Sequence, residues 1–324
     1  MTNYLITGGA GFVGSHLAEA LLERGHSVTI IDDLSTGRFE NIQHLVDDPQ
    51  FHFAIDTINN AVVLDRLASQ CEVIFHLAAA VGVKRILKNP ILTLETNMRG
   101  TEAVLKAALR YRAKVIITST SEVYGKRAQV PFEEGDDVVL GPTIHSRWAY
   151  AGSKMMDEFL SLAYFTKKAL PVVICRLFNT IGPRQTGQYG MVVPRFVRQA
   201  LAGKAITVYG DGKQRRSFTW VGDSVRAMIQ LSETPDAVGE VINIGHEKDI
   251  SIHELALLIK RMTGSSSSIQ FIPYEEVYEG GFEDMEARLP DLSKIKRLIA
   301  YQPTLDLPEI LDQVIAFEKG QGQG

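Results

Sequence analysis

The sequence has few of the residues that mark metal-binding or disulfide-stabilised proteins. Only two of its 324 residues are cysteines, Cys71 and Cys175, and both lie in apolar runs that resemble strands. We therefore expect buried, reduced thiols and no disulfide framework. The eight histidines form no H-x-x-x-H pattern and no cluster with cysteine, so we expect no metal site.

Long apolar runs and a strong net charge are also missing. No apolar run is long enough to cross a bilayer, and the first expected strand begins so close to Met1 that we expect no signal peptide. The formal net charge is −4, which favours neither nucleic acid nor an anionic membrane as a partner. The sequence therefore predicts a cytoplasmic enzyme that forms one large globular unit or two tightly joined lobes.

A glycine-rich segment near the N-terminus is the first positive feature. Tyr4–Thr7 predicts a short buried strand, and Ser15–Arg24 has the pattern of an amphipathic helix. Between them, Gly8, Gly11 and Gly14 have the spacing G-x-x-G-x-x-G. The first two glycines let the backbone approach a pyrophosphate, and the third lets helix and strand pack closely. The N-terminus of the helix then presents free N–H groups to the phosphates.

An acidic residue after the second expected strand indicates which dinucleotide binds. Val28–Ile31 is predicted to be that strand, and Asp32 follows it directly. A carboxylate here can accept hydrogen bonds from both hydroxyls of an adenosine ribose, and it repels a 2′-phosphate. Strand, glycines, helix, strand and acid in this order are far more specific than glycines alone, so we expect NAD as cofactor.

Strand-like and helix-like runs continue to alternate through the first half of the chain. Such alternation predicts an α/β fold with a doubly wound parallel sheet, the Rossmann arrangement, and ligands beyond the carboxyl ends of the strands. Asp56 follows the third strand and can reach the adenine, while the small residues of His76–Ala80 let a nucleotide lie close. The expected strands are Phe51–Ile55, Val73–Leu77, Val115–Thr118 and Val172–Leu177, with helices at Ala61–Ser69 and Thr93–Arg112.

The character of the chain changes after about Gly182, where proline and glycine become frequent and the elements shorter. We expect residues 1–181 to form the NAD-binding domain and residues 182–324 mainly a smaller α/β lobe for the substrate, with Val241–Ile244 able to return to the main sheet. Ser265–Ser268 is predicted to be a loop and Gly320–Gly324 a frayed tail. Further elements are expected at Gly190–Ala202, Ile206–Tyr209 and Ser251–Thr263.

Tyr150 and Lys154 are the strongest catalytic candidates. On a helix, positions i and i+4 share a face, so Lys154 can hold a positive charge near the Tyr150 phenol. A free phenol has a pKa of about 10 and is a poor base at neutral pH. A nearby cation and a positively charged nicotinamide both favour phenolate. Tyr150 is therefore a candidate general base for a sugar hydroxyl.

With these residues assigned, the chain resembles the extended short-chain dehydrogenase/reductases that modify nucleotide sugars. The resemblance covers essentially the whole length. The motifs that carry it are Thr7–Gly14, Asp32, His76–Ala79, Thr118–Gly125, Tyr150–Lys154, Arg176–Asn179, Gly182–Arg184 and Arg216–Asp223. The resemblance implies that a Thr/Tyr/Lys triad, here Thr120, Tyr150 and Lys154, oxidises the C4 hydroxyl of the sugar and passes hydride to tightly held NAD.

The motifs and the resemblance together imply a full set of binding residues. For the sugar nucleotide, a UDP-sugar, the implied contacts are Ser121, Asn179, Arg184, Tyr209, Arg216 and Arg288, and the forked guanidinium of Arg216 suits a diphosphate. For the cofactor they are Gly8, Gly11, Phe12, Val13, Gly14, Asp32, Asp56, Leu77, Ala78, Ala79, Asn97, Tyr150 and Lys154.

The residues after Thr120 indicate what happens to the 4-ketone. Dehydratases of this family show Asp-Glu there, but the first of the two is Ser121 in this chain. UDP-glucuronate decarboxylases show Thr-Ser-Glu-Val-Tyr-Gly, as at Thr120–Gly125, and some carry the Arg-Trp-x-Tyr-x-x-x-Lys run of Arg147–Lys154. Glu283–Pro290 resembles the decarboxylase segment whose arginine, here Arg288, faces the sugar. The resemblance thus implies decarboxylation, with Glu122 and Arg288 acting after hydride transfer.

Two alternatives remain open. A 4-epimerase of UDP-glucuronate or UDP-glucose needs the same triad, and Arg184 would then hold a carboxylate. Thr143–Ser146 and the loop Gln185–Tyr189 do not match the decarboxylases and keep this alternative open. A non-catalytic NAD-binding regulator is disfavoured by the intact triad. By analogy alone, the helices Thr93–Arg112 and Tyr150–Lys168 pair two subunits, which predicts a homodimer.

Overall fold

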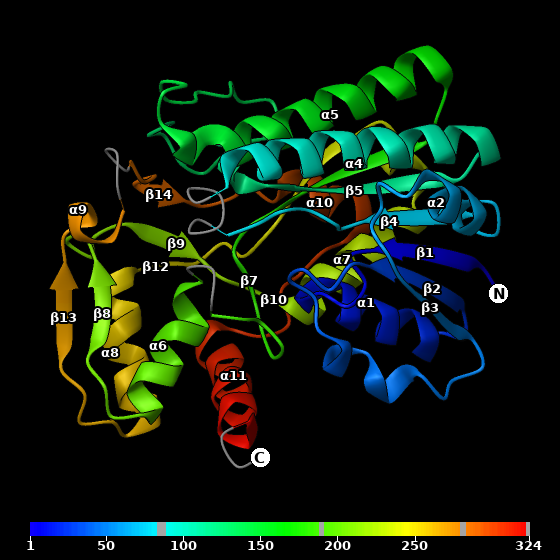
Figure 1. Cartoon of the computed structure of the whole chain (residues 1–324). Helices are drawn as coiled ribbons and strands as arrows, with labels where there is room; N and C mark the ends of the chain where they lie inside the picture. The colour runs from blue at the N-terminus through cyan, green and yellow to red at the C-terminus, as the bar shows by residue number, and fades with distance from the viewer. Residues whose placement is uncertain (83–88, 188–190, 279–282, 322–324) are drawn as a thin grey trace.

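A seven-stranded sheet forms the centre of the larger lobe in the computed structural model, which describes residues 1–82, 89–187, 191–278 and 283–321 (Figure 1). Its strand order is β11-β6-β5-β4-β1-β2-β3, and every pairing is parallel. The predicted doubly wound sheet is therefore confirmed. The strands are β1 (Asn3–Thr7), β2 (Ser27–Asp32), β3 (Phe51–Ile55), β4 (Val73–His76), β5 (Lys114–Thr120), β6 (Val172–Leu177) and β11 (Val241–Ile244).

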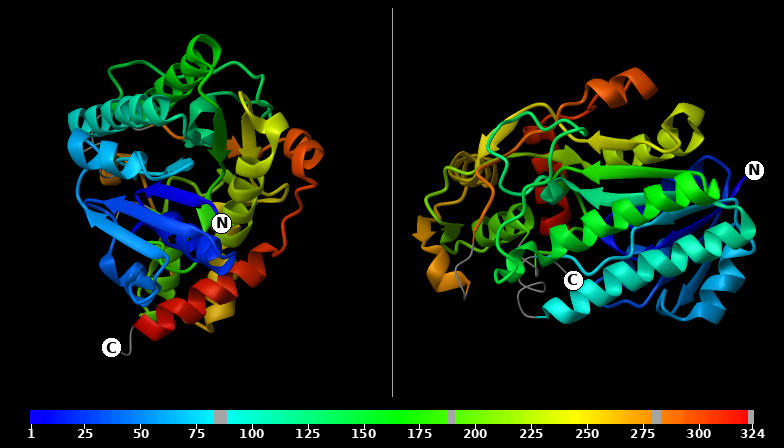
Figure 2. Two further views of the ribbon diagram at one scale, coloured as in Figure 1. Left: turned by 90° about the vertical axis from the view of Figure 1, so that its right-hand side faces the viewer. Right: turned by 90° about the horizontal axis from the view of Figure 1, so that it is seen from above.

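Helices cover both faces of this sheet (Figure 2). Strands buried on both faces need apolar side chains throughout, and Leu5 and Ile6 illustrate this, because they alternate between the two cores and are both fully buried. One core lies under α1 (Phe12–Glu23), α7 (Val221–Glu233) and α10 (Ser293–Ile299). The other lies under α2 (Ala61–Ala68), α4 (Pro90–Tyr111) and α5 (Ala149–Lys168).

Element bounds follow the sequence closely, with differences at the helix starts. α1 begins at Phe12, three residues before the expected Ser15, because Gly11 is its extended N-cap. α4 begins at Pro90, where proline is well tolerated because its missing N–H has no partner in a first turn. The helical spacing of apolar residues in the sequence indicated both helices, but it could not locate their first turns.

The smaller lobe has its own core and several short sheets. Its core lies between helices α6, α8 and α11, and a capping box of Ser251 and Glu254 fixes the start of α8. Ser265–Ser268 forms a loop as predicted. Gly320 lies inside α11, so the tail prediction is wrong there, and residues 322–324 lie outside the described residues. The elements are α6 (Val192–Leu201), α8 (Ile252–Thr263), α9 (Tyr274–Val277) and α11 (Leu307–Gln321), with β7 (Thr180–Ile181), β8 (Ile206–Tyr209), β9 (Arg215–Ser217), β10 (Thr219–Trp220), β12 (Asp249–Ser251), β13 (Ile269–Ile272) and β14 (Ala287–Arg288).

The chain passes between the lobes more than once. After building α6 and β8 in the smaller lobe, it returns to place β11 beside β6 at the edge of the main sheet. β11 pairs in register with β6, with Val241 opposite Ile174 and Ile244 opposite Leu177. The division of the chain at residue 181 stays a prediction, and the structure adds that the main sheet takes its last strand from beyond that point.

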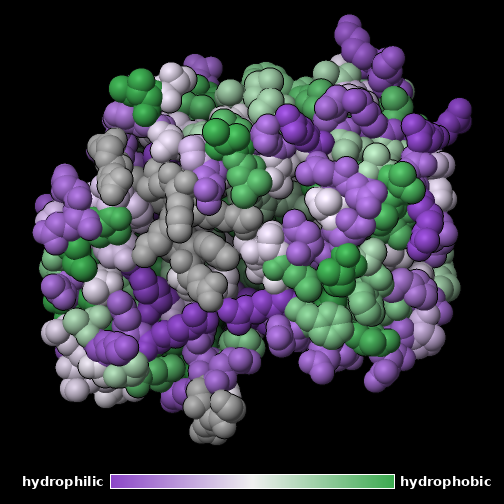
Figure 3. Space-filling view, viewed as in Figure 1, coloured by the Kyte–Doolittle hydropathy of each residue, from purple (hydrophilic) through white to green (hydrophobic). Residues whose placement is uncertain are grey.

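The surface is mixed in character. On the face seen in Figure 3, hydrophobic residues are scattered among hydrophilic ones. Within the described part of the chain, no helix combines the length and the apolar character that a bilayer crossing requires.

Candidate active site

One cavity of about 650 Å³ runs from the glycine-rich loop to the smaller lobe. It opens beyond the carboxyl ends of β1, β2, β4 and β5, where ligands bind in sheets of this type. Most of the predicted cofactor residues line one half of it. These are Gly8, Gly11, Phe12, Val13, Gly14, Asp32, Asp56, Leu77, Ala78, Ala79 and Tyr150.

The glycine loop leaves no room for side chains. Gly8 has a φ of +73°, and a Cβ there would lie 2.8 Å from the backbone nitrogen of Ala78. A Cβ on Gly14 would lie 2.3 Å from the backbone oxygen of Gly8. The loop therefore packs directly against the start of α1, and the helix N-terminus faces the cavity as a dinucleotide phosphate site requires.

Asp32 is held rigidly at the end of β2. Its two carboxylate oxygens accept hydrogen bonds from the backbone N–H groups of Ala10 at 3.0 Å and Leu34 at 2.8 Å. Burial raises the pKa of Asp32, and these hydrogen bonds partly oppose the rise. The carboxylate is thus oriented before any ribose arrives, which lowers the cost of binding.

Two of the predicted cofactor residues, Asn97 and Lys154, are not on the cavity wall. Asn97 is almost fully buried, accepts a hydrogen bond from the Ala80 backbone N–H at 2.7 Å, and donates one to Ser153 Oγ at 2.9 Å. It therefore ties the segment after β4 to α5, and its contact with the cofactor stays a prediction. The sequence could not distinguish these roles, because a buried amide is satisfied equally well by either partner.

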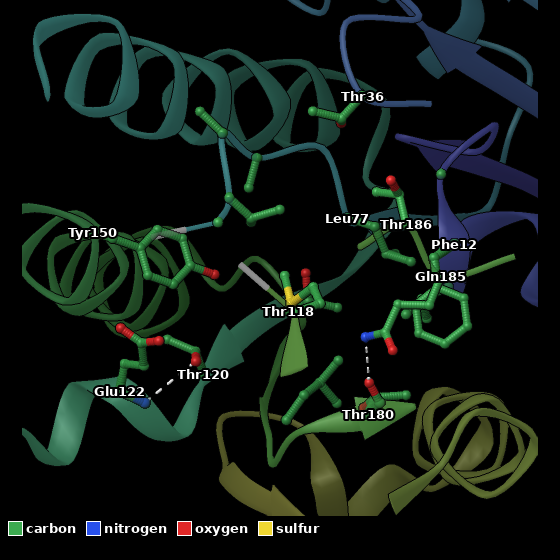
Figure 4. Close-up of a pocket in the computed structure, with 18 of the residues that line it drawn as sticks. Phe12, Thr36, Leu77, Thr118, Thr120, Glu122, Tyr150, Thr180, Gln185 and Thr186 are labelled. Atoms are coloured by element: carbon green, nitrogen blue, oxygen red, sulfur yellow. Dashed lines mark hydrogen bonds between the residues drawn. The ribbon is translucent and has the colours of Figure 1, made fainter. Parts of the chain in front are cut away.

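Tyr150 faces the middle of the cavity from the first turn of α5, with Thr120 and Glu122 nearby (Figure 4). Thr120 ends β5, and its hydroxyl caps the short helix η3 (Ser121–Tyr124) by accepting a hydrogen bond from the Glu122 N–H. Burial, then the charges of Glu122 and Asp157, raise the pKa of Tyr150, whereas Arg288 and a hydrogen bond with Thr120 lower it. Protein charges alone therefore favour the neutral phenol.

Lys154 has a carboxylate partner on its own helix. Its Nζ lies 2.8 Å from Asp157 Oδ2, and the two side chains are 2% and 1% exposed. Asp157 was not among the predicted residues, although its position three residues after Lys154 places its carboxylate within reach of the lysine on the same helix. In this structure the positive charge of Lys154 is paired along α5.

Glu122 lies between two guanidiniums. Its carboxylate oxygens are 2.5 Å from Arg147 Nη1 and 3.3 Å from Arg288 Nη1. Burial alone would raise the pKa of Glu122, but Arg147 and Arg288 outweigh it, so the pKa is lowered and the group is ionised at neutral pH. The structure thus brings Glu122 and Arg288 together as predicted and adds Arg147, which the Arg-Trp-x-Tyr run contained without an assigned role.

Asp284 links this cluster to the smaller lobe. Its Oδ1 lies 3.0 Å from Arg216 Nη2 and 3.8 Å from both Arg147 Nη2 and Arg288 Nη2. Burial lowers the pKa of Arg216 to about 10, with Asp284 opposing and Arg288 adding to the shift, so this guanidinium remains charged at neutral pH. Three guanidiniums against two carboxylates leave a net positive charge at this end of the cavity, which suits a phosphorylated or carboxylated ligand.

The remaining predicted substrate residues divide into two groups. Ser121, Asn179 and Tyr209 line the cavity together with Arg216 and Arg288. Arg184 does not: it donates two 2.8 Å hydrogen bonds to the carboxylate of Glu19 on α1 and is not on the cavity wall. The planar fork of Arg184 is thus matched by a carboxylate from the first helix, and its role in substrate binding stays a prediction.

Four further cavity residues were missed by the sequence analysis. Tyr274, Tyr278 and Arg195 line the smaller-lobe end, where the Arg195 guanidinium stacks on the Tyr209 ring at 3.7 Å. Gln214 donates a 3.0 Å hydrogen bond to the Tyr274 hydroxyl. No spacing in the sequence connects them, because they come from α6, α9 and loops far apart in the chain. The Gln185–Tyr189 loop is described only to residue 187.

Comparisons with known proteins show the family of the chain. The family model described as GDP-mannose 4,6 dehydratase matches residues 5–314. The chain is 45% identical to a UDP-N-acetyl-alpha-D-glucosaminuronate decarboxylase of Bacillus cytotoxicus, over 97% of this chain and 96% of that protein. It is 38% identical to UDP-glucuronic acid decarboxylase 1 of Danio rerio, over 97% of this chain and 72% of that protein.

Solved structures extend the comparison to related chemistries. A UDP-glucuronic acid 4-epimerase from Bacillus cereus, in complex with UDP-glucuronic acid and NAD, is 31% identical with a TM-score of 0.89, covering 98% of this chain and 99% of that one. A dTDP-glucose 4,6-dehydratase from Bacillus anthracis, in complex with NAD, is 25% identical with a TM-score of 0.88, covering 100% and 98%. The chain belongs to the extended short-chain dehydrogenase/reductases, in the NAD-dependent nucleotide-sugar epimerase and dehydratase family.

Proposed function

We propose that the protein is an NAD-dependent UDP-glucuronate decarboxylase that yields UDP-xylose or its 4-ketone. The observation that carries this proposal is the position of Glu122, ionised between Arg147 and Arg288, beside the Thr120–Tyr150 pair in one cavity. The 38% identical decarboxylase of Danio rerio supports the same reaction. An intact Thr120, Tyr150 and Lys154 argues against a non-catalytic regulator.

The first step is oxidation at C4 of the sugar. NAD⁺, when bound, supplies the hydride acceptor and a positive ring near Tyr150. Tyr150 takes the proton from the C4 hydroxyl, and Thr120 orients that oxygen from the end of β5. Asp32, the glycine loop and the small residues after β4 are the parts of the chain that would hold the dinucleotide.

The second step is loss of carbon dioxide from the resulting β-keto acid. The bond between C5 and the carboxylate carbon breaks, and its electrons form an enolate on the C4 oxygen, which Tyr150 and Thr120 can stabilise by hydrogen bonds. Arg288 lies where a guanidinium can orient the sugar carboxylate. The negative charge of Glu122 repels the sugar carboxylate beside it. Loss of that carboxylate as neutral carbon dioxide removes this repulsion. A proton is then added to C5. Where UDP-xylose is the product, hydride must also return to C4, and Tyr150 gives its proton back to the C4 oxygen.

A second substrate is favoured by a specific observation. The 45% identical relative from Bacillus cytotoxicus is named for UDP-N-acetylglucosaminuronate. That sugar carries the same C4 hydroxyl and C5 carboxylate, so Thr120, Tyr150 and Glu122 would act on it unchanged. The two substrates differ at C2, and selectivity between them would come from that part of the cavity wall.

A product assay tests the proposal directly. The purified enzyme would be incubated with NAD and, separately, each UDP-uronate, and carbon dioxide and nucleotide-sugar products would be measured. We expect carbon dioxide and a UDP-pentose or its ketone from UDP-glucuronate. A higher kcat/KM for the N-acetylated sugar would move the assignment to that substrate. UDP-galacturonate with its carboxylate retained would establish the 4-epimerase alternative, as would UDP-galactose from UDP-glucose.

We also propose that the enzyme is a cytoplasmic homodimer. α4 and α5 lie side by side on the outside of the molecule (Figure 2) and expose apolar side chains, with Ile91 72% and Phe159 60% exposed. Met98 and Met156 extend this face. Sedimentation should give a dimer, and Phe159→Glu should dissociate it while Leu257→Glu on α8 should not. A monomeric wild-type protein would contradict the proposal.

The compartment is supported by the cysteines. Cys71 and Cys175 are both free, and burial raises each thiol pKa to about 12, so both stay as unreactive thiols.

A further inference from the structure

Three side chains of the catalytic helix lie in one line along its inner face. Tyr150, Lys154 and Asp157 occupy positions i, i+4 and i+7 of α5, which stack on one side of a helix. Tyr150 lines the cavity, whereas Lys154 and Asp157 are almost completely buried behind it. Lys154 donates its 2.8 Å hydrogen bond to Asp157 and not to Tyr150. The line therefore ends in a carboxylate that competes with the phenol for the same cation.

We propose that Asp157 is a positioning residue that holds Lys154 away from Tyr150 and so delays formation of the phenolate until the cofactor's positive ring is in place. A buried Lys–Asp pair acts on its surroundings as a dipole, whereas an unpaired Lys154 would act as a full positive charge. Asp157 thus determines how strongly the positive charge of Lys154 stabilises the Tyr150 phenolate. Only the kinetic part of the test below depends on the proposed decarboxylation.

The other charges around Tyr150 are compensated from outside α5. Glu122, on η3, is paired with Arg147, on η4 (Ser146–Trp148), and with Arg288 on β14. His76, at the end of β4, is neutral because burial, and next the charge of Lys154, lower its pKa to about 3. Against this background, the balance between Lys154 and Asp157 is the contribution that comes from the catalytic helix itself.

The charge on Asp157 acts in the direction that the proposal requires. Burial is the largest cause of the raised pKa of Tyr150, Glu122 comes next, and Asp157 follows as a further cause. Removing the Asp157 charge should therefore lower that pKa in two ways, by deleting a nearby anion and by uncovering Lys154. An unpaired opposite charge at about 4–6 Å shifts a pKa by roughly 1–3 units, so we expect a shift of about one unit or more.

The test observes Tyr150 directly and does not need turnover. Protein with ¹³C at the tyrosine ζ-carbon, saturated with NAD⁺, would be titrated by NMR, with the Tyr150 signal assigned by its loss in Tyr150→Phe. We expect Asp157→Asn to lower the Tyr150 midpoint by about one unit or more, a tenfold gain in phenolate at a given pH. Asp65→Asn, which removes the partner of Arg110 on the distant surface, should leave the midpoint unchanged.

Three variants separate positioning from a merely structural role. Lys154→Met alone should raise the Tyr150 midpoint, because the Asp157 charge is then unopposed. The double variant Lys154→Met/Asp157→Asn removes both charges and should return the midpoint close to the wild-type value. It also avoids the unpaired buried charge that either single variant leaves. Asp157→Glu should restore most of the wild-type midpoint. An unchanged or raised midpoint in Asp157→Asn would overturn the proposal, as would identical midpoints in Lys154→Met and the double variant.

The kinetic arm uses UDP-glucuronate with the NAD-loaded enzyme. In Asp157→Asn the acid limb of the kcat/KM profile should move to lower pH by the same amount as the NMR midpoint. An unmoved acid limb beside a shifted NMR midpoint would overturn the catalytic part of the inference. If wild-type enzyme turns over neither UDP-uronate, the decarboxylase proposal fails, while the NMR titration still decides whether Asp157 controls Tyr150.

Discussion

The two halves of the cavity are built in opposite ways. The cofactor half comes from consecutive elements, β1, the glycine loop, α1 and β2. Its polar group Asp32 is satisfied by backbone N–H groups, those of Ala10 in the glycine loop and of Leu34 just after β2. The sugar half draws Glu122, Arg147, Arg216 and Asp284 from four distant segments, and they are satisfied by one another.

This contrast teaches where rigidity and charge come from. Backbone geometry fixes the cofactor half, because a Cβ on Gly14 would collide with the chain itself. Side-chain electrostatics fix the sugar half, because each buried charge there has an opposite charge nearby. A mutation in the first half should alter binding through shape, and one in the second through charge and proton affinity.

The largest expected effect is that of Tyr150→Phe, which should separate catalysis from binding in the cofactor half of the cavity. Tyr150→Phe should leave the fold and NAD binding near normal and lower turnover by at least the ~10²–10⁴-fold that general-base catalysis contributes. Steady-state kinetics and calorimetric NAD binding would measure both. Retention of more than about a tenth of the rate would mean that another group takes the proton.

The next largest effect is expected from Glu122→Gln and Arg288→Met. Both variants remove a member of the charge cluster that is proposed to act after hydride transfer. Carbon dioxide loss should slow by roughly 10²-fold, as for the removal of one electrostatic stabiliser, while C4 oxidation continues. NADH absorbance should therefore build up in a single turnover. Arg215→Met is the control, because Arg215 is 45% exposed and pairs with Asp249 outside the cavity. Equal slowing of both steps would assign Glu122 a structural role.

Gly14→Ala tests the shape-defined half. The added methyl would lie 2.3 Å from the Gly8 oxygen, so backbone must shift at a cost of about 1–3 kcal/mol. Calorimetry should register this as roughly 5–150-fold weaker NAD binding. Gly135→Ala, where a Cβ meets nothing within 4 Å, should bind NAD normally. Unchanged NAD binding by Gly14→Ala would show that the glycine loop accommodates a Cβ at this position without a shift of the backbone.

The smallest effect concerns stability near the boundary of the two halves. Burial, then the charge of Lys154, lower the pKa of His76 to about 3, and its ring contacts Thr7 and Thr101 hydroxyls at 2.8 and 3.0 Å. Below about pH 6.5 the unfolded state takes up a proton that the folded state does not. As the pH drops from there to about 3, this group therefore lowers the free energy of unfolding by up to about 1.4 kcal/mol per pH unit.

Chemical unfolding at several pH values would measure this dependence. His76→Gln should flatten the slope, whereas His52→Gln on the exposed face of β3 should not. Equal slopes for the two variants would mean that His76 is protonated in the folded protein.

Most of the residues that the sequence assigned to the cofactor line one cavity, since they are local and the glycines obey a backbone rule. Asn97 and Lys154 lie off the cavity wall, because a buried amide or ammonium gives no sign in the sequence of which partner it faces. In the sugar half, the resemblance brought in Glu122 and Arg288, but Asp284, Arg195 and the Lys154–Asp157 pair emerged only from the structure. Ion pairs between distant segments follow from how the chain is folded, and spacing in the sequence does not encode them.

The return of β11 to the main sheet bears on how the molecule can be made and divided. β11 covers the edge of β6, and its residues appear on the ribosome only after α6, β8 and β9 of the smaller lobe have been synthesised. Until then β6 presents a row of unpaired backbone groups, which invites pairing with other chains. A fragment ending at Ile181 would keep that open edge permanently and also lose the cover of α7, so residues 1–181 lack part of the sheet and core that they need to fold alone.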